Sequence, residues 1–235
     1  IQAFNLVGKF NKIHITRATM SMEKRGPDFQ DIYIDEWVGL GHRRLSVIDT
    51  SENAHQPMWD VSGRYCIVYN GEIFNFSALK KDLESKGITF RSQSDTEVLL
   101  NLYILEKEEC LQKLNGFFSF CIYDKHEQSF FVVRDRYGIK PLLYLYDEDK
   151  FIFASEMKTM LEYGIEKVLD YTSLVTYLQL NYIPAPDTIF SKVKKLQPGH
   201  YIKLAAKQLS ITRWYAIPFH REQAEKNPIT YDSAK

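Results

Sequence analysis

The apolar residues of this chain fall mainly in short runs that are separated by polar turns. Two of these runs, residues 117–123 and 129–133, flank a polar segment, and the runs at 142–146 and 151–154 flank another. A pair of apolar runs on either side of a short polar turn is typical of a β-hairpin. Because hairpins join antiparallel strands, the pattern predicts a protein built largely from antiparallel sheets.

Further strands are predicted by shorter runs at residues 32–34, 37–40 and 65–69 and, directly after Arg44, at 45–48. The runs at 65–69 and 117–123 are apolar or aromatic almost throughout, instead of alternating with polar residues. Such strands are expected to be covered on both of their faces. Two sheets that stack face to face, with helices outside them, would provide this cover.

Helical signals mark residues 77–86, a segment that begins at Ser94, and residues 155–163 and 170–182. The sequence Ser94-Asp95-Thr96-Glu97 is a capping box, which satisfies the first backbone N–H groups of a helix. We therefore predict an α+β protein, a four-layer α-β-β-α sandwich of antiparallel sheets. Because no clear break precedes about residue 215, residues 1–215 are predicted to form one domain and the polar residues 216–235 a linker.

Composition narrows the classes of function. Of the 235 residues, 45% are hydrophobic and 26% charged, which excludes a disordered chain. Thirty basic residues balance thirty acidic ones, which argues against a nucleic-acid or membrane-surface binder. No apolar run approaches the roughly 20 residues of a membrane helix. The three Cys are too scattered for a disulfide framework or a metal site, so we expect no metal and a cytoplasmic location.

Five polar clusters stand out, at residues 25–28, 41–49, 70–75, 94–98 and 134–142. Each has an ordinary interpretation when it is taken alone. Asn70-Gly71 is a common hairpin turn. Arg43-Arg44 reads as a solvated pair, and the Arg134-Asp135-Arg136 sequence as a structural ion network. On this basis none of the clusters predicts a functional site by itself.

Taken together, the clusters resemble one family. Their sequences RGPD, GHRRLSVID, NGEIFN, SDTEV and RDRYGIKPL follow the order and spacing of the N-terminal glutaminase domain of glutamine-dependent asparagine synthetases. The segments QPM at 56–58, FASEMK at 153–158, YIPAPDTIF at 182–190 and PGH at 198–200 extend the resemblance to about Tyr215. It implies a class II glutamine amidotransferase with the N-terminal-nucleophile hydrolase fold.

The resemblance also implies a reaction, the hydrolysis of glutamine to glutamate and ammonia through a thioester on an N-terminal Cys. Arg44 matches the position that binds the substrate α-carboxylate, for which a guanidinium is suited because it offers two parallel donors. Asp95 and Glu72 match the acceptors for the substrate α-ammonium. Val47 matches a position whose backbone lines the glutamine site.

The oxyanion hole falls on Asn70 and Gly71, with the side-chain amide of Asn70 and the backbone N–H of Gly71 as donors. Losing one such donor typically lowers the rate by about 10²–10³-fold. Because glycine lets the backbone approach a substrate closely, an Asn-Gly pair at a strand end suits this role.

Two departures from the family pattern matter. The catalytic Cys is not in the chain, and Ile1 aligns with the Ile of the family's Cys-Gly-Ile terminus, so the nucleophile is expected two residues upstream. Lys24 stands where the family usually has His. Cys66, Cys110 and Cys121 cannot supply an α-amine base, and we interpret at least two of them, those that fall in apolar strands, as core thiols.

The Gly-rich ATP loop of the family's synthetase half does not occur in this sequence. We expect no cofactor in this domain, and ATP and Mg²⁺ only in a C-terminal synthetase domain that amidates aspartate with the released ammonia. The expected partners are glutamine and that domain, with a homodimer as a candidate assembly. Two alternatives stay open: an amidotransferase for another carboxylate, on a surface sugar or secondary metabolite, and a degenerate, non-catalytic domain.

Overall fold

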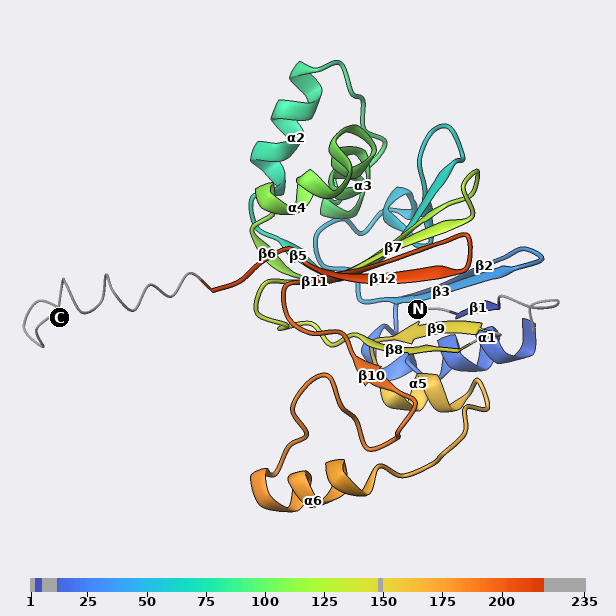
Figure 1. Cartoon of the computed structure of the whole chain (residues 1–235). Coiled ribbons are helices and arrows are strands. Elements are labelled where there is room, and N and C mark those ends of the chain that lie inside the picture. Colours follow the sequence, from blue (N-terminus) through green and yellow to red (C-terminus); the bar gives the residue numbers. More distant parts are fainter. Residues whose placement is uncertain (1–2, 6–11, 148–149, 218–235) are drawn as a thin grey trace, which may run out of the picture.

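Two six-stranded sheets face one another in the computed structural model, which describes residues 3–5, 12–147 and 150–217 (Figure 1). The first sheet has the order β10-β8-β9-β1-β3-β2. Its strands are β1 (Ala3–Asn5), β2 (Phe29–Ile34), β3 (Val38–Arg44), β8 (Leu143–Tyr146), β9 (Lys150–Ala154) and β10 (Lys194–Lys195). The second sheet has the order β12-β11-β7-β6-β5-β4. Its strands are β4 (Met58–Trp59), β5 (Tyr65–Ile73), β6 (Gly116–Asp124), β7 (Ser129–Arg134), β11 (His200–Ala205) and β12 (Gln208–Arg213).

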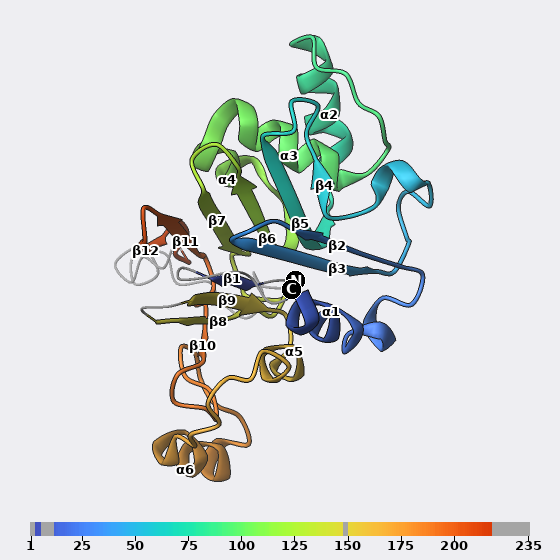
Figure 2. The same ribbon diagram turned by 90° about the vertical axis from the view of Figure 1, so that its right-hand side faces the viewer.

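Helices cover the outer faces of both sheets. The α-helices are α1 (Lys12–Met20), α2 (Phe76–Ser85), α3 (Asp95–Glu106), α4 (Cys110–Lys113), α5 (Met157–Leu161) and α6 (Tyr171–Leu180). Short 3₁₀ turns are η1 (Glu23–Arg25), η2 (Glu52–Ala54) and η3 (Lys107–Glu109). α2, α3 and α4 lie on the second sheet, and α1 and α5 lie on the first (Figures 1 and 2). The predicted four-layer sandwich of antiparallel sheets is therefore confirmed.

The sequence pattern of β5 and β6 reflects this layering. Cys66 and Val68 of β5 belong to the core between the sheets, whereas Ile67 and Tyr69 belong to the core beneath α2 and α3. Successive side chains of a strand point to opposite faces, so a strand covered on both faces needs apolar residues at every position. This is why the two strands read as unbroken apolar runs.

The main differences from the predicted elements lie at their ends. Residues 45–48 are not a strand, because β3 ends at Arg44 and the side chains of Leu45 and Val47 are exposed. Helix α5 is shorter than predicted, and β5 continues through residues 70–73 instead of ending in a turn. Both predicted hairpins are present, as β6–β7 and β8–β9. Most of the predicted linker, residues 218–235, lies outside the described residues.

Candidate functional site

A cavity of about 330 Å³ opens where the end of β3, the loop after it, the end of β5 and the start of α3 meet. All six residues that the sequence predicts for the substrate site line this cavity: Arg44, Val47, Asn70, Gly71, Glu72 and Asp95. They come from both sheets and from a helix, so the site exists only when the layers are assembled. The 3₁₀ turn η1 reaches the cavity through Arg25, while Lys24 beside it is exposed.

Asn70 lies within β5, paired with Ser119 of β6. The alternative interpretation of Asn70-Gly71 as a hairpin turn is therefore wrong. Asn70 follows Tyr69, whose side chain packs beneath the helices, so it points to the opposite face, toward the first sheet. There its Nδ2 lies 3.4 Å from the hydroxyl of Ser155, which directly follows β9.

Gly71 is required by the packing of β5 against β6. A Cβ atom at this position would lie 2.3 Å from the carbonyl oxygen of Phe117 and 2.7 Å from Cα of Phe118. Both are backbone atoms of the neighbouring strand, so they cannot move aside as a flexible side chain can. The close approach of β6 thus explains why position 71 is a glycine. This structural requirement is separate from the predicted role of its backbone N–H as a donor. Glu72, the next residue, is exposed at the cavity.

Arg44 is buried, with only 7% of its surface exposed. Its Nη1 donates a hydrogen bond of 3.1 Å to the carbonyl oxygen of Ser51. Burial lowers the pKa of the guanidinium, against the opposing fields of Asp49 and Asp28. A guanidinium has five N–H donors. Arg44 thus combines a buried positive charge with donors beyond the one used by Ser51, which is the chemistry that a carboxylate ligand needs.

Arg43 has a different environment from its neighbour. Its Nε donates to the carbonyl oxygen of Gly26 at 2.8 Å, and its Nη1 donates to Oε1 of Gln30 at 2.8 Å. The interpretation of the two arginines as a solvated pair is wrong, because Arg44 is buried and Arg43 ties η1 and β2 to β3.

Asp95, the first residue of α3, is 5% exposed. Its Oδ2 accepts hydrogen bonds from the hydroxyl of Tyr69 at 2.7 Å and from the backbone N–H of Ile73 at 3.0 Å. Burial raises the pKa of this carboxyl, while the hydrogen bonds from Tyr69 and Ile73 act in the opposite direction. These hydrogen bonds fix the carboxylate at the cavity wall.

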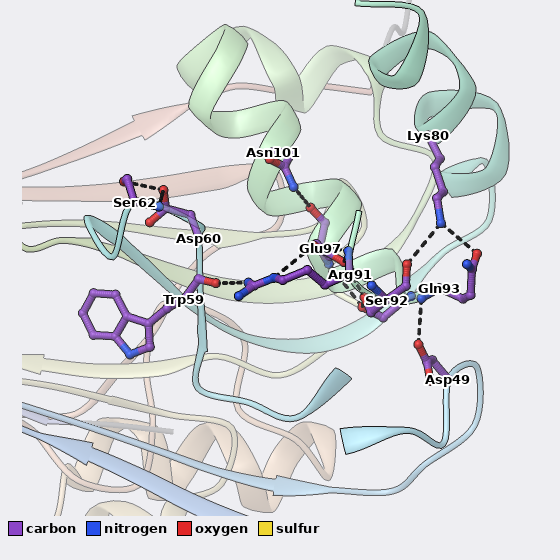
Figure 3. Close-up of polar contacts among 11 residues, drawn as sticks. Asp49, Trp59, Asp60, Ser62, Lys80, Arg91, Ser92, Gln93, Glu97 and Asn101 are labelled. Carbon is purple, nitrogen blue, oxygen red and sulfur yellow. Dashed lines mark hydrogen bonds and ion pairs between the residues drawn. The ribbon is translucent and has the colours of Figure 1, made fainter. Parts of the chain in front are cut away.

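Val47 lies in the loop that connects β3 to η2, with 72% of its surface exposed. The backbone N–H of Ser46 donates to Oδ2 of Asp28 at 2.7 Å, and Oδ2 of Asp49 accepts from the N–H of Gln93 at 2.7 Å. Figure 3 shows Asp49 reaching this backbone just before α3. These anchors hold the loop backbone against the cavity although the Val47 side chain is exposed.

The segment that leads into α3 is itself fixed by polar contacts (Figure 3). The carboxylate of Glu97 accepts from the backbone N–H groups of Arg91 and Ser92, at 3.0 Å and 2.7 Å. Lys80 of α2 donates to the carbonyl oxygen of Ser92 at 3.1 Å and to Oε1 of Gln93 at 2.7 Å. Because Asp95 directly follows this segment, its position depends on the same network.

Sequence reasoning assigned no role to His42, which also lines the cavity. Its Nε2 lies 3.0 Å from the carbonyl oxygen of Tyr69, and Oε1 of Gln56 accepts from the N–H of Tyr69 at 2.6 Å. Burial is the main cause that lowers the pKa of His42 to about 3. The sequence did contain a signal for His42. It lies two residues before Arg44 on the same strand, so the two side chains are on the same face of the sheet.

A second cavity, of about 50 Å³, lies beside the first. Arg25, His42, Arg43 and Asn70 line both of them, and the second is completed by Met22, Ser155 and Glu156. Its residues come from η1 and its N-cap, β3, β5 and the segment after β9, so it lies between the two sheets next to the predicted oxyanion donor.

The Arg134-Asp135 sequence organises a loop, and within the described ranges no ion pair of 4 Å or less joins Arg134, Asp135 or Arg136 to another side chain. The carboxylate of Asp135 accepts from the backbone N–H groups of Tyr137, Ile139 and Lys140 at 3.0–3.1 Å. Arg134 donates to the carbonyl oxygens of Lys140 and Gly138, at 2.9 Å and 2.7 Å. The loop presents Lys140 to the main cavity.

The three cysteines are buried and unpaired, so the interpretation of Cys66 and Cys121 as core thiols holds and Cys110 joins them. Burial raises the pKa of each thiol. None of the three lines the main cavity. In the described part of the chain, no helix has the length and apolar character to cross a membrane.

Comparison with known proteins identifies the class and then the family. A solved glutamine phosphoribosylpyrophosphate amidotransferase from Bacillus subtilis superposes with a TM-score of 0.67 at 19% identity, over 92% of this chain and 49% of that one. The fold is thus the N-terminal-nucleophile hydrolase fold of glutamine amidotransferases, as predicted. The chain belongs to the glutamine amidotransferase domain family, which matches residues 4–215.

Its curated relatives are longer proteins. Asparagine synthetase [glutamine-hydrolyzing] 1 of Bacillus subtilis is 41% identical over 95% of this chain and 37% of its own length. A putative asparagine synthetase 2 of Methanocaldococcus jannaschii is 33% identical over 95% of this chain and 46% of its own length. Amidase chry2 of Gibberella zeae is 35% identical over 76% of this chain and 26% of its own length. The chain therefore spans less than half of each.

Proposed function

We propose that this domain hydrolyses glutamine to glutamate and ammonia. The observation that carries the proposal is the single cavity that gathers Arg44, Asp95 and Asn70 from three different elements. Glutamine has an α-carboxylate, an α-ammonium and a carboxamide. A buried guanidinium, a fixed carboxylate and a side-chain amide donor match these three groups one by one.

Glu72 and Val47 extend the same assignment. The exposed carboxylate of Glu72 lies beside Gly71 and adds negative charge where the substrate ammonium is expected. The loop of Val47, anchored by Asp49, offers backbone groups to the amino-acid end of the substrate. At the other end, Asn70 and the N–H of Gly71 would donate to the oxyanion of the tetrahedral intermediate.

The register of β1 supports the entry of an N-terminal nucleophile into this site. Ala3 pairs with Gly39 of β3 and with Ile152 of β9. A Cys four positions before Ala3 would, in the same register, come level with Arg43 and Glu156. Both of these residues line the second cavity, next to Asn70.

The proposed reaction uses the α-amine of that Cys as the base, because an α-amine has a pKa of about 7.7–8.0. The amine takes the thiol proton, and the thiolate attacks the carboxamide carbon. The C–N bond then breaks as the ammonium returns its proton to the leaving nitrogen, which gives ammonia and a thioester. Water hydrolyses the thioester to glutamate.

We further propose that the ammonia is consumed in an adjoining C-terminal domain that binds ATP and Mg²⁺ and amidates aspartate. The names of the relatives and their greater length support this proposal. The surface of α6 supports an adjoining domain too, because Tyr171, Val175 and Leu178 follow one stripe and are 73%, 53% and 72% exposed. The buried, unpaired thiols are consistent with a cytoplasmic location.

The second candidate function is the amidation of a carboxylate other than that of aspartate. The match to an amidase of Gibberella zeae favours it, because the name of that relative gives a different activity from that of the synthetases. Both candidates share the glutaminase reaction, and they differ only in the acceptor.

The test uses the full-length protein with a free Cys at its mature terminus, which intact mass verifies. Glutamate release is measured with glutamine alone, and asparagine formation with glutamine, ATP, Mg²⁺ and aspartate. We expect both products. Glutamate without asparagine would leave the glutaminase proposal standing and favour another acceptor. The absence of glutamate release would refute the proposed function.

A further inference from the structure

Ser155 is a buried residue between the two sheets, and its side chain contacts Asn70. It is 6% exposed and directly follows β9 of the first sheet. Its hydroxyl oxygen accepts a hydrogen bond of 3.4 Å from Nδ2 of Asn70, which belongs to β5 of the second sheet. Both residues line the second cavity, and Asn70 also lines the main one. The contact is therefore made directly on the side-chain amide that is the predicted oxyanion donor.

The backbone around Ser155 is held on both sides. Ala154, the residue before it, pairs with Leu143 of β8. Glu156, the residue after it, accepts a hydrogen bond of 2.9 Å from Nη1 of Arg25 in η1. The hydroxyl of Ser155 thus has a defined position, from which it can restrain a neighbouring side chain.

The amide of Asn70 needs a restraint of this kind. The last torsion of an Asn side chain has broad minima, so packing along the strand does not by itself fix the amide. Within the residues that the structure describes, the bond to Ser155 is the one hydrogen bond of the Asn70 side chain. An amide nitrogen has two N–H donors. One of them is used by Ser155, which leaves the other for a ligand.

We propose that Ser155 is a positioning residue, whose hydroxyl holds the Asn70 amide in the orientation from which its second N–H donates to the oxyanion. This inference rests on the proposed function and deepens it. Donors that are oriented before the reaction stabilise the transition state best, because no reorganisation is then needed as charge develops. Ser155 exchanges no proton and acts only through Asn70.

Two serines on facing positions allow a matched comparison. Ser155→Ala removes the hydroxyl without adding bulk. Ser119→Ala is the control, because Ser119 pairs with Asn70 across β5 and β6 and is 3% exposed. Its hydroxyl donates to the carbonyl oxygen of Pro141, also at 3.4 Å, and not to Asn70. The control thus loses a buried hydroxyl and a bond of equal length, but leaves the restraint on the amide in place.

Glutamate release and melting temperature are measured on the full-length protein with its free N-terminal Cys. We expect kcat of Ser155→Ala to fall about 3- to 10-fold, as for one neutral hydrogen bond, with KM for glutamine nearly unchanged. A contact that matters only in the transition state gives this division between the two constants. Ser119→Ala should keep both constants, whatever its melting temperature.

A double-mutant cycle tests whether Ser155 acts through Asn70. In the Asn70→Ala background the amide is already absent, so adding Ser155→Ala should lower kcat by less than about twofold. An equal fall in both backgrounds would overturn the inference, since a merely structural serine predicts that result. So would an unchanged kcat in folded Ser155→Ala, or an equal fall in Ser119→Ala. A parent protein that releases no glutamate would refute the proposed function instead, and this inference with it.

Discussion

The hydroxyl of Tyr69 donates a 2.7 Å hydrogen bond to Oδ2 of Asp95, and this contact joins the second sheet to the first turn of α3. Tyr69 also bonds through its backbone, with its N–H to Gln56 and its carbonyl oxygen to His42. One residue therefore connects a helix, the loop before β4 and the first sheet. Among the residues that the structure describes, Tyr69 is the side chain that donates a hydrogen bond to Asp95.

Tyr69→Phe should weaken glutamine binding. It removes a side-chain donor to a buried carboxylate, and hydrogen bonds to charged groups are worth about 1.5–3 kcal/mol. We expect KM for glutamine to rise about 10-fold or more, with a smaller change in kcat and a lower melting temperature. Tyr146→Phe, which removes an exposed hydroxyl bond to Lys207, is the control and should change neither kinetic constant. An unchanged KM in folded Tyr69→Phe would show that Asp95 needs no such support.

Arg44→Lys should keep the positive charge but lose the two-pronged geometry. The loss of a charge-assisted hydrogen bond, about 1.5–3 kcal/mol, should appear as a higher KM for glutamine. Steady-state kinetics of the full-length enzyme measure it. Arg64→Lys is the control, because Arg64 forms a bidentate contact with both carboxylate oxygens of Asp124, away from the cavity, and should affect stability only. Normal glutamine affinity in Arg44→Lys would make Arg44 a structural residue.

Asn70→Asp should remove catalysis more than binding. The substitution replaces a donor with a negative charge that faces the developing oxyanion, so glutamate release should fall at least about 10²-fold. Glutamine binding and the melting temperature should change much less, because the contact strengthens in the transition state. Asn70 lies inside β5 and not in a turn. A mild effect of the substitution could therefore not be explained by Asp forming the same turn as Asn. Near-normal turnover would refute the oxyanion role.

Gly71→Ala should destabilise the protein. The added Cβ would meet backbone of β6 at 2.3 Å, so β5 and β6 must separate locally. Overpacking of this kind costs typically about 1–3 kcal/mol, visible as a lower melting temperature. In the control Gly63→Ala the new Cβ meets nothing within 4 Å, and only the backbone strain at φ +68° remains. Equal melting temperatures for the two variants would contradict this account of β5.

His42→Gln should change how stability depends on pH. Burial lowers the pKa of His42 from 6.5 to about 3 in the folded protein, so the unfolded chain binds the extra proton between these values. This contribution of His42 to stability is complete above pH 6.5 and is lost as the pH falls toward 3. From pH 7 to pH 5 the parent should lose about 2 kcal/mol that His42→Gln does not lose. Denaturant unfolding at both pH values measures this, and a pH-independent difference between parent and variant would contradict it.

The elements that local sequence determines were predictable. Ser94 accepts from the backbone N–H of Glu97, which is one of the two bonds of a capping box, and helix α3 begins at the next residue. The Glu97 carboxylate accepts from the N–H groups of Arg91 and Ser92 and not from that of Ser94. The polar residues between β6 and β7 mark their turn. The loop after Arg44 was not predictable, because its apolar residues suit a strand locally. Its backbone is held instead by Asp28 and Asp49, through contacts distant in sequence.

The residues of the candidate site also divide into those that the sequence predicts and those that depend on contacts distant in sequence. Its six predicted residues were found by their place in motifs, and the structure brings all six to one cavity. Tyr69 and His42 were missed as site residues, since their importance lies in a contact between strands of two different sheets. Asn70-Gly71 was compatible with a turn on local grounds, and only the neighbouring strand at Phe117 explains why a glycine stands inside β5.

The alternation along β5 restricts which changes of chain length the domain can tolerate. Tyr69 faces α3 while Asn70 faces the first sheet, so deleting or inserting one residue between Tyr65 and Tyr69 would exchange the two faces. The amide of Asn70 would then point at the helices, and the phenol of Tyr69 would point at the reaction centre. The predicted oxyanion donor and the hydrogen bond to Asp95 would be lost together. A change in the number of residues in β5 is therefore expected to harm the site more than a change of a single side chain that keeps the register.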